Sequence, residues 1–234
     1  MRGSPIADNT FIGNLPKPVT QYQQTLLVAR MAHQLRLNGM HHALALAAIA
    51  WCCALQSAHA ESHHGFAAKA VAAGDTQGRN FAVIDKSAAS VSVFNPAGKL
   101  LASSPVLLGL AKGDASVPGI GERAISDIAE HERTTPAGRF ATESGKNLNG
   151  ETVVWIDYDA AVSMHRLRPS NPLEKRPERM ATASPLDNRI TYGCVNVPAE
   201  FYDRWILPLL GKTAGVVYVL PETLPAKKLF AFLK

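Results

Sequence analysis

The 234-residue sequence predicts a mostly β domain after its first third, and three observations support this prediction. Short runs of β-branched and aromatic residues recur from residue 80 onward. Turns rich in Gly and Pro separate these runs. A single helix-like pattern stands out, after residue 198, so strands are expected to outnumber helices.

The first predicted strands form a meander. Residues 81–85 (FAVID) and 90–94 (SVSVF) are short β-prone runs. The turn NPAG at 95–98 follows, because Pro presets φ and Gly relieves the turn exit, and it leads into 99–101. Residues 107–110 extend the same meander. Further strands are predicted at residues 139–142, 152–158, 161–165 and 216–220.

One helix is predicted directly after Pro198. Proline suits a first helical turn, and Phe201, Trp205 and Leu209 recur at intervals of four. Pro208 should end or kink this helix.

A proline-rich segment covers residues 166–189. It contains four prolines, six basic residues and three acidic residues, and it is too broken for a long helix. The pattern predicts a surface loop. Two interpretations stay open: the loop is a lid or substrate-binding flap, or it is a solvated excursion.

The beginning of the sequence resembles an export leader. Residues 40–60 contain an apolar run of about a dozen residues that ends in Ala-His-Ala, the small-x-small pattern of a signal-peptidase site. This run is short for a membrane span of ~20 residues, so a cleaved signal is favoured over an anchor or a buried helix. The pattern predicts a periplasmic or cell-envelope protein with no stable membrane span after cleavage.

Four parts follow along the chain. They are an upstream extension with the signal peptide (1–60), a flexible lead-in (61–78), the β domain (79–221) and a C-terminal tail (222–234). After residue 60 the chain carries 20 Lys and Arg against 18 Asp and Glu, a net charge of +2, compared with +5 for the whole sequence. This balance argues against a nucleic-acid partner, which requires a concentrated basic face.

Cys194 is the one thiol that remains once the leader is removed, because Cys52 and Cys53 lie within the apolar run. An unpaired thiol in an oxidising compartment is a liability unless it is buried or used. Gly193 allows close approach of the backbone to a substrate, and the helix after Pro198 is expected to bring a partly positive N-terminus near the thiol. These features favour a catalytic thiolate over a Cys that only packs as a small hydrophobe.

His165 is the candidate base. It ends the β-prone run AVSMH, where alternation turns it to the face opposite Met164. The other candidates are less suitable, since His63 and His64 fall in the expected lead-in and His131 falls in a charged stretch. The His and acidic residues show no ligand-like cluster, so neither a metal site nor a cofactor is expected.

These residues resemble the YkuD-type L,D-transpeptidases, exported bacterial enzymes of peptidoglycan. The family signature is a His followed at a distance by Ser/Thr-His-Gly-Cys-x-Asn/Arg, and this sequence has His165 followed by TYGCVN at 191–196. Residues 82–109 resemble the opening β-meander of the family, and TPAGRF at 135–140 matches its Thr-Pro-x-Gly-x-Phe element. The resemblance spans about residues 80–220.

The resemblance implies a curved β-sandwich of mixed sheets with one or two short helices and the Cys in a cleft. It also implies a two-step acyl transfer, in which Cys194 attacks the diaminopimelate carbonyl of a tetrapeptide stem, D-Ala leaves and an amine accepts the acyl group. His165 would act as general base and then acid, and backbone N–H groups near Gly193 and Cys194 would hold the oxyanion. The oxyanion and substrate-binding residues would be Thr191, Tyr192, Gly193 and Asn196.

Two departures from the family pattern affect the expected site. Tyr192 stands where the family usually has His, and a phenol does not accept a proton near neutral pH as an imidazole does. Tyr192 is therefore expected to alter the substrate subsite, while Asn196 orients the loop or the substrate. The 29-residue distance from His165 to Cys194 also exceeds the common family spacing. The geometry of the flap between them, and with it the identity of the acyl acceptor, therefore stays open.

Three functions are compatible with this sequence. The first is an L,D-transpeptidase that joins peptide stems of peptidoglycan or attaches a wall-anchored protein to them. The second is an L,D-carboxypeptidase or amidase, which passes the same acyl group to water. The third is a catalytically inactive wall-binding protein, for which Tyr192 would be the sign of decay.

Overall fold

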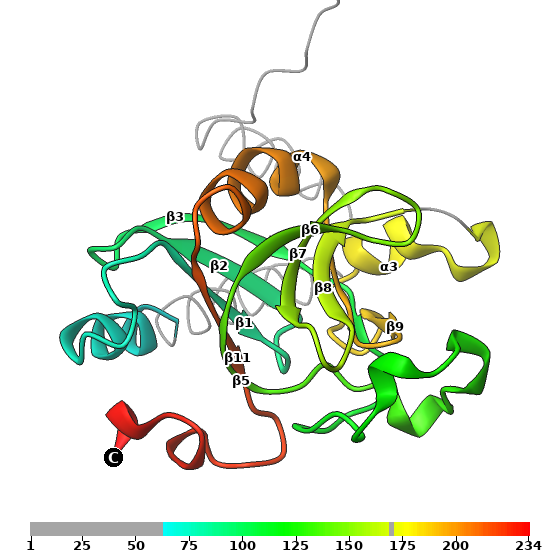
Figure 1. Ribbon diagram of the computed structural model, residues 1–234, viewed down its shortest axis with the longest axis horizontal. Helices are drawn as coiled ribbons and strands as arrows, with labels where there is room; N and C mark the ends of the chain where they lie inside the picture. Colours follow the sequence, from blue (N-terminus) through cyan, green and yellow to red (C-terminus); the bar gives the residue numbers. More distant parts are fainter. Residues whose placement is uncertain (1–62, 169–170) are drawn as a thin grey trace, which may run out of the picture. The chain divides into compact units, whose positions relative to one another are not determined.

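The computed structural model describes residues 63–168 and 171–234 (Figure 1). The predicted upstream extension and signal peptide, residues 1–60, lie outside this described part. The described residues are mainly β, with mixed sheets and short helices, which confirms the predicted fold class. No helix within the two ranges combines the length and the apolar character needed to cross a bilayer.

The larger sheet has five strands in the order β3-β2-β1-β11-β5 (Figure 1). Their bounds are β1 (Phe81–Asp85), β2 (Ser90–Phe94), β3 (Leu100–Pro105), β5 (Gly138–Ala141) and β11 (Val216–Leu220). The first three strands form the predicted meander and pair antiparallel. The prediction that residues 107–110 extend it is wrong, because β4 in this stretch pairs with β9 instead of β3. Strand β11 pairs parallel with β1 and antiparallel with β5, so a strand near the end of the chain lies between two earlier strands of the sheet.

The second sheet has four strands in the order β10-β8-β7-β6, and β4 and β9 form a separate parallel pair. The bounds are β4 (Leu108–Gly109), β6 (Glu143–Lys146), β7 (Thr152–Asp157), β8 (Val162–Arg166), β9 (Arg189–Thr191) and β10 (Val195–Val197). Strands β6, β9 and β10 were not predicted. Each is only three or four residues long, too short to show a clear period of two.

The two large sheets share one apolar core. Alternate residues of β1 and β11 enter this core, including Ala82, Ile84, Val217 and Val219. The second sheet and the helix that follows it contribute, among others, Val154, Met164, Val195, Val197, Ile206 and Leu210. Burying each larger aliphatic side chain contributes roughly 1.5–3 kcal/mol. Because strand side chains alternate, this burial directs the intervening residues of β8 and β10 to the opposite face.

A helix at residues 63–72 packs on the other face of the larger sheet. Its buried apolar residues, Phe66, Ala67 and Ala70, belong to a second apolar cluster that includes Tyr218 of β11. The Phe66 and Tyr218 rings meet edge to face, with centroids 5.3 Å apart. The prediction of a flexible lead-in over 61–78 is therefore wrong for this helix. One Phe and two Ala form its apolar face, which is too weak a pattern to recognise without the sheet.

The last residues also belong to the packed domain. Phe230 is 2% exposed and lies in the same cluster as Phe66. The predicted boundary between a domain ending at 221 and a tail over 222–234 is corrected accordingly, because the final segment covers apolar surface of the sheet. Two 3-10 turns form this segment, η7 (Ala226–Lys228) and η8 (Ala231–Leu233).

The helix after Pro198 begins as α4 (Ala199–Phe201) and continues as the π-helix η6 (Tyr202–Gly211). Pro208 was predicted to end or kink the helix, and since it lies inside η6 the helix does not end there. Proline removes an i→i−4 hydrogen bond and clashes with that carbonyl in an α-helix, whereas η6 is wound with i→i−5 bonds, as Lys212 N–H to Leu207 O shows. The most buried face is Tyr202, Ile206 and Leu210, one residue after the predicted stripe.

The segment 166–189 contains the 3-10 turn η5 (Pro172–Glu174) and the short helix α3 (Arg176–Ala181). Met180 of α3 is 6% exposed, so a wholly solvated excursion is wrong for this part of the segment. Three more 3-10 turns lie between β4 and β5, and they are η2 (Ile120–Glu122), η3 (Ile125–Asp127) and η4 (Glu130–Glu132).

Candidate active site

Cys194 follows a tight turn between β9 and β10, and its thiol is free and half-buried. Gly193 adopts a φ of +128°, and a Cβ at this position would lie 2.9 Å from the carbonyl oxygen of Thr134. Only glycine fits such a backbone without strain. The hydroxyl of Thr191 donates to the Cys194 carbonyl at 2.6 Å and accepts from the Gly193 N–H at 3.2 Å. The turn thus holds Cys194 on a fixed backbone.

The register of β8 and β10 brings Cys194 and His165 to one face of the second sheet. The strands are parallel, and Asn196 lies opposite His165. Two residues earlier on each strand, Cys194 comes beside Ser163, with 3.8 Å between Sγ and the serine Oγ. The thiol also donates to the carbonyl of Ala161 at 3.6 Å. Sequence segments 29 residues apart therefore form one polar face.

The ring of His165 is oriented by its own strand. Nδ1 lies 2.9 Å from the carbonyl oxygen of Arg166. Since a carbonyl can only accept, Nδ1 carries a proton and Nε2 is the free acceptor of the neutral ring. Burial would lower the pKa of His165, but the hydrogen bond and the charge of Cys194 outweigh burial and raise it.

The thiol is shifted toward its reactive form. Burial would raise the pKa of Cys194, but interaction with His165 and hydrogen bonds from the backbone and hydroxyl of Ser163 outweigh burial and lower it. The thiolate is the nucleophilic form of cysteine. The helix that begins at Ala199 is not the cause, because the three residues of β10 intervene, about 10 Å of extended chain. The expectation that the helix N-terminus would act on the thiol is corrected.

Two of the predicted oxyanion and substrate residues have structural roles. The N–H of Gly193 is bonded to Thr191, and its carbonyl accepts from Thr135 Oγ1 at 2.8 Å. Thr191 is 3% exposed and uses its hydroxyl within the turn. Both groups already shape the turn. Oxyanion binding by N–H groups near Gly193 and Cys194, and substrate binding by Thr191, stay predictions.

Tyr192 is the most exposed residue of the turn, at 39%. The guanidinium carbon of Arg133 lies 4.1 Å from the centroid of its ring, within cation–π range. Arg133 also donates to the carbonyl of Ile128, which anchors the guanidinium on its other side. The turn therefore carries a supported aromatic ring with a cation against it, directly before Gly193 and Cys194.

Asn196 is 1% exposed and connects three elements. Its backbone N–H and carbonyl each bond to Leu107 at 2.9 Å. Its side-chain Oδ1 accepts from Arg176 Nη1 of α3 at 2.9 Å, and its Nδ2 lies 3.2 Å from Nε2 of His165.

Sequence reasoning missed three residues of this site, Ser163, Thr135 and Arg176. The signal for Ser163 was its place two residues before His165 in a predicted strand, which puts both on one face. Thr135 opens the TPAGRF element, although nothing local indicates that its hydroxyl reaches Gly193. For Arg176 no sequence signal exists beyond its membership of the basic segment 166–189.

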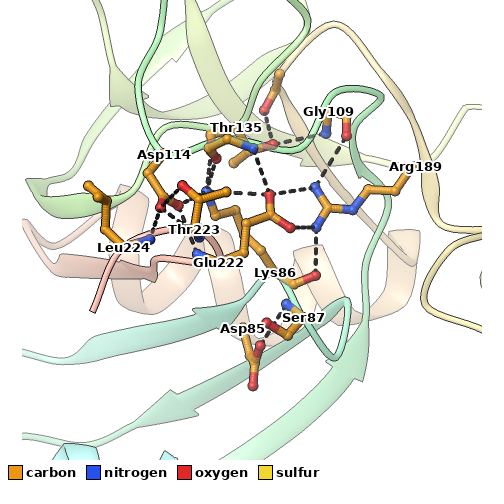
Figure 2. A network of polar contacts seen from close by, with 12 residues as sticks. Asp85, Lys86, Ser87, Gly109, Asp114, Thr135, Arg189, Glu222, Thr223 and Leu224 are labelled. Atoms are coloured by element: carbon orange, nitrogen blue, oxygen red, sulfur yellow. Dashed lines mark hydrogen bonds and ion pairs between the residues drawn. The ribbon is translucent and has the colours of Figure 1, made fainter. Parts of the chain in front are cut away.

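A buried cluster of charges lies beside Thr135 and Arg189 (Figure 2). Lys86 Nζ contacts Asp114 Oδ1 at 2.8 Å and donates to the Thr135 carbonyl at 3.0 Å. Arg189, the first residue of β9, pairs with Glu222, and its guanidinium also donates to the carbonyl of Lys86. The side chains of these four charged residues are at most 8% exposed. The cluster thus supports both Thr135 and β9.

No group of three or more His, Cys, Asp and Glu side chains is placed to hold a metal ion within residues 63–168 and 171–234. The polar face around Cys194 contains a thiol, an imidazole, a hydroxyl and an amide. Such a set of groups can carry out nucleophilic attack with proton transfer.

Neither a family model nor a curated protein matches the chain. Solved structures do match. One is the LD transpeptidase LdtMt1 in complex with imipenem, at 16% identity and a TM-score of 0.36, with 60% of this chain and 58% of that chain covered. Another is the catalytic domain of the Enterococcus faecium L,D-transpeptidase, at 19% identity and a TM-score of 0.33, with 60% and 96% covered.

A third match is the helical cell shape determining protein Pgp2 from Campylobacter jejuni, at 13% identity and a TM-score of 0.38, with 62% of this chain and 48% of that chain covered. The chain therefore spans less than two thirds of the length of LdtMt1 and of Pgp2. Several of the structures that it resembles are L,D-transpeptidases, the family whose motif its residues 191–196 resemble.

Proposed function

We propose that the chain is an exported peptidoglycan L,D-transpeptidase that works through a thioester on Cys194. The observation that carries this proposal is the juxtaposition of Cys194 and His165 on one face of strands β8 and β10. Their pKa values are shifted in opposite directions, each by the other, which favours a thiolate beside an imidazolium. The TYGCVN motif suggests the substrate, a tetrapeptide stem of peptidoglycan.

In the first step, Nε2 of His165 takes the thiol proton and Sγ of Cys194 attacks the diaminopimelate carbonyl. The tetrahedral intermediate collapses as Nε2 gives its proton to the departing nitrogen of D-Ala, which leaves a thioester. In the second step an acceptor amine attacks the thioester carbonyl and loses a proton to Nε2, which returns it to the departing sulfur. The Arg166 carbonyl keeps the ring oriented throughout, since it accepts from Nδ1.

Tyr192 and Arg133 are the proposed wall of the substrate subsite. The ring is partly exposed beside the nucleophile, and the guanidinium lies against it. Peptide stems carry carboxylates, and an arginine binds such groups through paired hydrogen bonds. This arrangement takes the place of the imidazole that the family usually presents two residues before the Cys.

The decisive experiment incubates the purified chain with disaccharide-tetrapeptides and follows the products by mass. Cross-linked dimers that have lost D-Ala support the transpeptidase. Tripeptides alone indicate transfer to water, and so an L,D-carboxypeptidase. Unchanged substrate, with the same result from Cys194→Ala, indicates a wall-binding protein without chemistry.

Export to the periplasm is part of the same proposal and rests on the leader pattern at residues 40–60. Cleavage after Ala60 would make Glu61 the first residue of the mature protein. Mass measurement of the protein from a periplasmic fraction tests this, and retention of the leader in that fraction would contradict cleavage.

A further inference from the structure

The side chain of Asn196 lies between α3 and His165 with its two ends in different environments. Its Oδ1 is 2.9 Å from Arg176 Nη1, and its Nδ2 is 3.2 Å from His165 Nε2. A guanidinium has donors only, so Oδ1 has to face Arg176. The amide nitrogen is then left to face the imidazole, and Arg176 thereby determines which end of Asn196 the base meets.

This orientation suits only one protonation state of His165. Nδ1 donates to the Arg166 carbonyl, so Nε2 of the neutral ring is an acceptor and matches the N–H of Asn196. When Nε2 takes the proton of Cys194, a donor of the ring would meet a donor of the amide. Asn196 is 1% exposed, so this mismatch would occur where little water can relieve it.

The guanidinium is itself held in place. Arg176 Nε donates to Glu174, its neighbour in η5, while Nη1 reaches Asn196. The charged or titratable groups that act on His165 are Cys194, which favours the protonated ring, and Arg176, whose positive charge opposes it. The charge and the amide orientation thus act in the same direction, against the imidazolium.

We propose that Arg176 is a positioning residue that fixes the amide of Asn196 and so opposes the transfer of a proton from Cys194 to His165. When Arg176 leaves Asn196, the amide can turn and present Oδ1 to a protonated Nε2. That turn releases the thiolate and imidazolium pair for attack. This inference rests on the proposed roles of Cys194 and His165.

The test is the pH dependence of alkylation of Cys194 by iodoacetamide, followed by the mass of the peptide that contains it. Arg176→Met removes the donor and the charge, and it should react about tenfold faster below the wild-type midpoint, a shift of about one pH unit. Arg176→Gln lacks the charge but keeps a donor toward Oδ1, so it should stay within about threefold of wild type.

Arg179→Met is the matched control for damage to the helix. Arg179 also lies on α3 and donates to the carbonyls of Glu174 and Asp187, but not to Asn196. It should leave the midpoint unchanged. Equal shifts in Arg176→Met and Arg176→Gln would show an effect of charge alone and would overturn the inference, as would an Arg176→Met profile that matches Arg179→Met.

A second variant, at Asn196, tests the proposal even if Arg176→Met does not fold. Asn196→Asp presents an acceptor to Nε2 whichever way it turns, so it should also lower the midpoint, and a raised midpoint would contradict the proposal. His165→Ala distinguishes failure of the proposed Cys194–His165 pair from failure of the proposed role of Arg176. If it leaves the profile unchanged, the Cys194–His165 pair fails. If it shifts the profile and Arg176→Met does not, only the role of Arg176 fails.

Discussion

Two polar regions of the molecule differ in how they carry charge. In the buried charge cluster, Lys86 pairs with Asp114 and Arg189 pairs with Glu222, two cations with two anions (Figure 2). In the candidate active site, the thiol of Cys194 and the imidazole of His165 share one proton, which either group can hold. The first region has fixed charges, whereas the second has a charge that appears only when a proton moves.

The difference separates a structural cluster from a reactive one. Burial would raise the pKa of Asp114, but its hydrogen bonds from Lys86 and from residues 222–223 outweigh burial and lower it, so it stays ionised. Burial lowers the pKa of Lys86, and Asp114 and Glu222 counteract that effect. Opposite charges stabilise each other there, so neither is available for chemistry. Perturbed ionisable groups therefore indicate a reactive site only when the perturbation leaves a proton free to move.

The largest expected effect belongs to the reactive region. His165→Ala should lower transpeptidation by about 10²–10⁴-fold, because the thiol loses its proton acceptor. Its free energy of unfolding should change little compared with a variant of the charge cluster. Steady-state rates and urea unfolding on the same preparation measure both, and full activity in His165→Ala would remove this residue from the mechanism.

A variant of the charge cluster should lose stability and keep the reactivity of Cys194. Glu222→Gln leaves Arg189 and Lys86 with one anion between them, and buried charges left unpaired cost about 3–5 kcal/mol of stability. The midpoint of Cys194 alkylation should not move. Glu200→Gln, at an exposed position of α4, is the control for removal of a surface charge. Urea unfolding in which the two variants are alike would contradict a stabilising role for the cluster.

Strong acid should weaken the cluster. The pKa of Asp114 is below its ordinary value of 3.8, so its stabilisation is present above that value and is lost as the pH falls below it. Unfolding free energies between pH 7 and pH 2.5 should fall by about 2 kcal/mol more for wild type than for Asp114→Asn. Parallel curves for the two proteins would show that another carboxylate determines the acid response.

Thr135 contacts both regions, so a variant of its side chain tests stability and thiol reactivity together. Its hydroxyl donates to the Gly193 carbonyl and accepts from the Gly109 N–H, while its own carbonyl accepts from Lys86. Thr135→Val should cost about 1–3 kcal/mol of stability and also slow alkylation of Cys194, because the turn loses its support.

Thr142→Val is the matched control for Thr135→Val. Thr142 makes a similar pair of hydrogen bonds, to the carbonyl of Leu210 and from the N–H of Gly215, but these groups do not belong to the turn. It should lose stability without a change in alkylation rate. If both threonine variants slow alkylation equally, the effect is one of general loosening.

The smallest expected effect is that of Ser163→Ala. The hydroxyl lies 3.8 Å from Sγ, and the backbone of Ser163 contributes a second hydrogen bond that the variant keeps. Alkylation near neutral pH should therefore slow only about threefold, as the thiol pKa moves up. Ser104→Ala is a control, since that hydroxyl donates to the neighbouring Pro105 carbonyl and not to the thiol. Faster alkylation in Ser163→Ala would contradict a stabilising contact with the thiolate.

Local pattern was sufficient for three five-residue strands that are rich in β-branched and aromatic residues. The runs at 81–85, 90–94 and 216–220 form β1, β2 and β11 with the predicted bounds. It failed where partners supply the stability. Strands β9 and β10 have only three residues each, and the helix over 63–72 has an apolar face of one Phe and two Ala. Segments of this kind are stable only against the sheet that they contact.

The sequence alone was enough to select the candidate residues, because a cysteine after a glycine and a histidine at a strand end can be identified without coordinates. Which polar groups contact one another depends on the tertiary structure. The parallel register of β8 and β10 sets Ser163 beside Cys194, and α3 brings Arg176 to Asn196. In the folded chain the Gly193 N–H donates to Thr191 within the turn. Such contacts depend on pairing between distant segments, which no local pattern encodes.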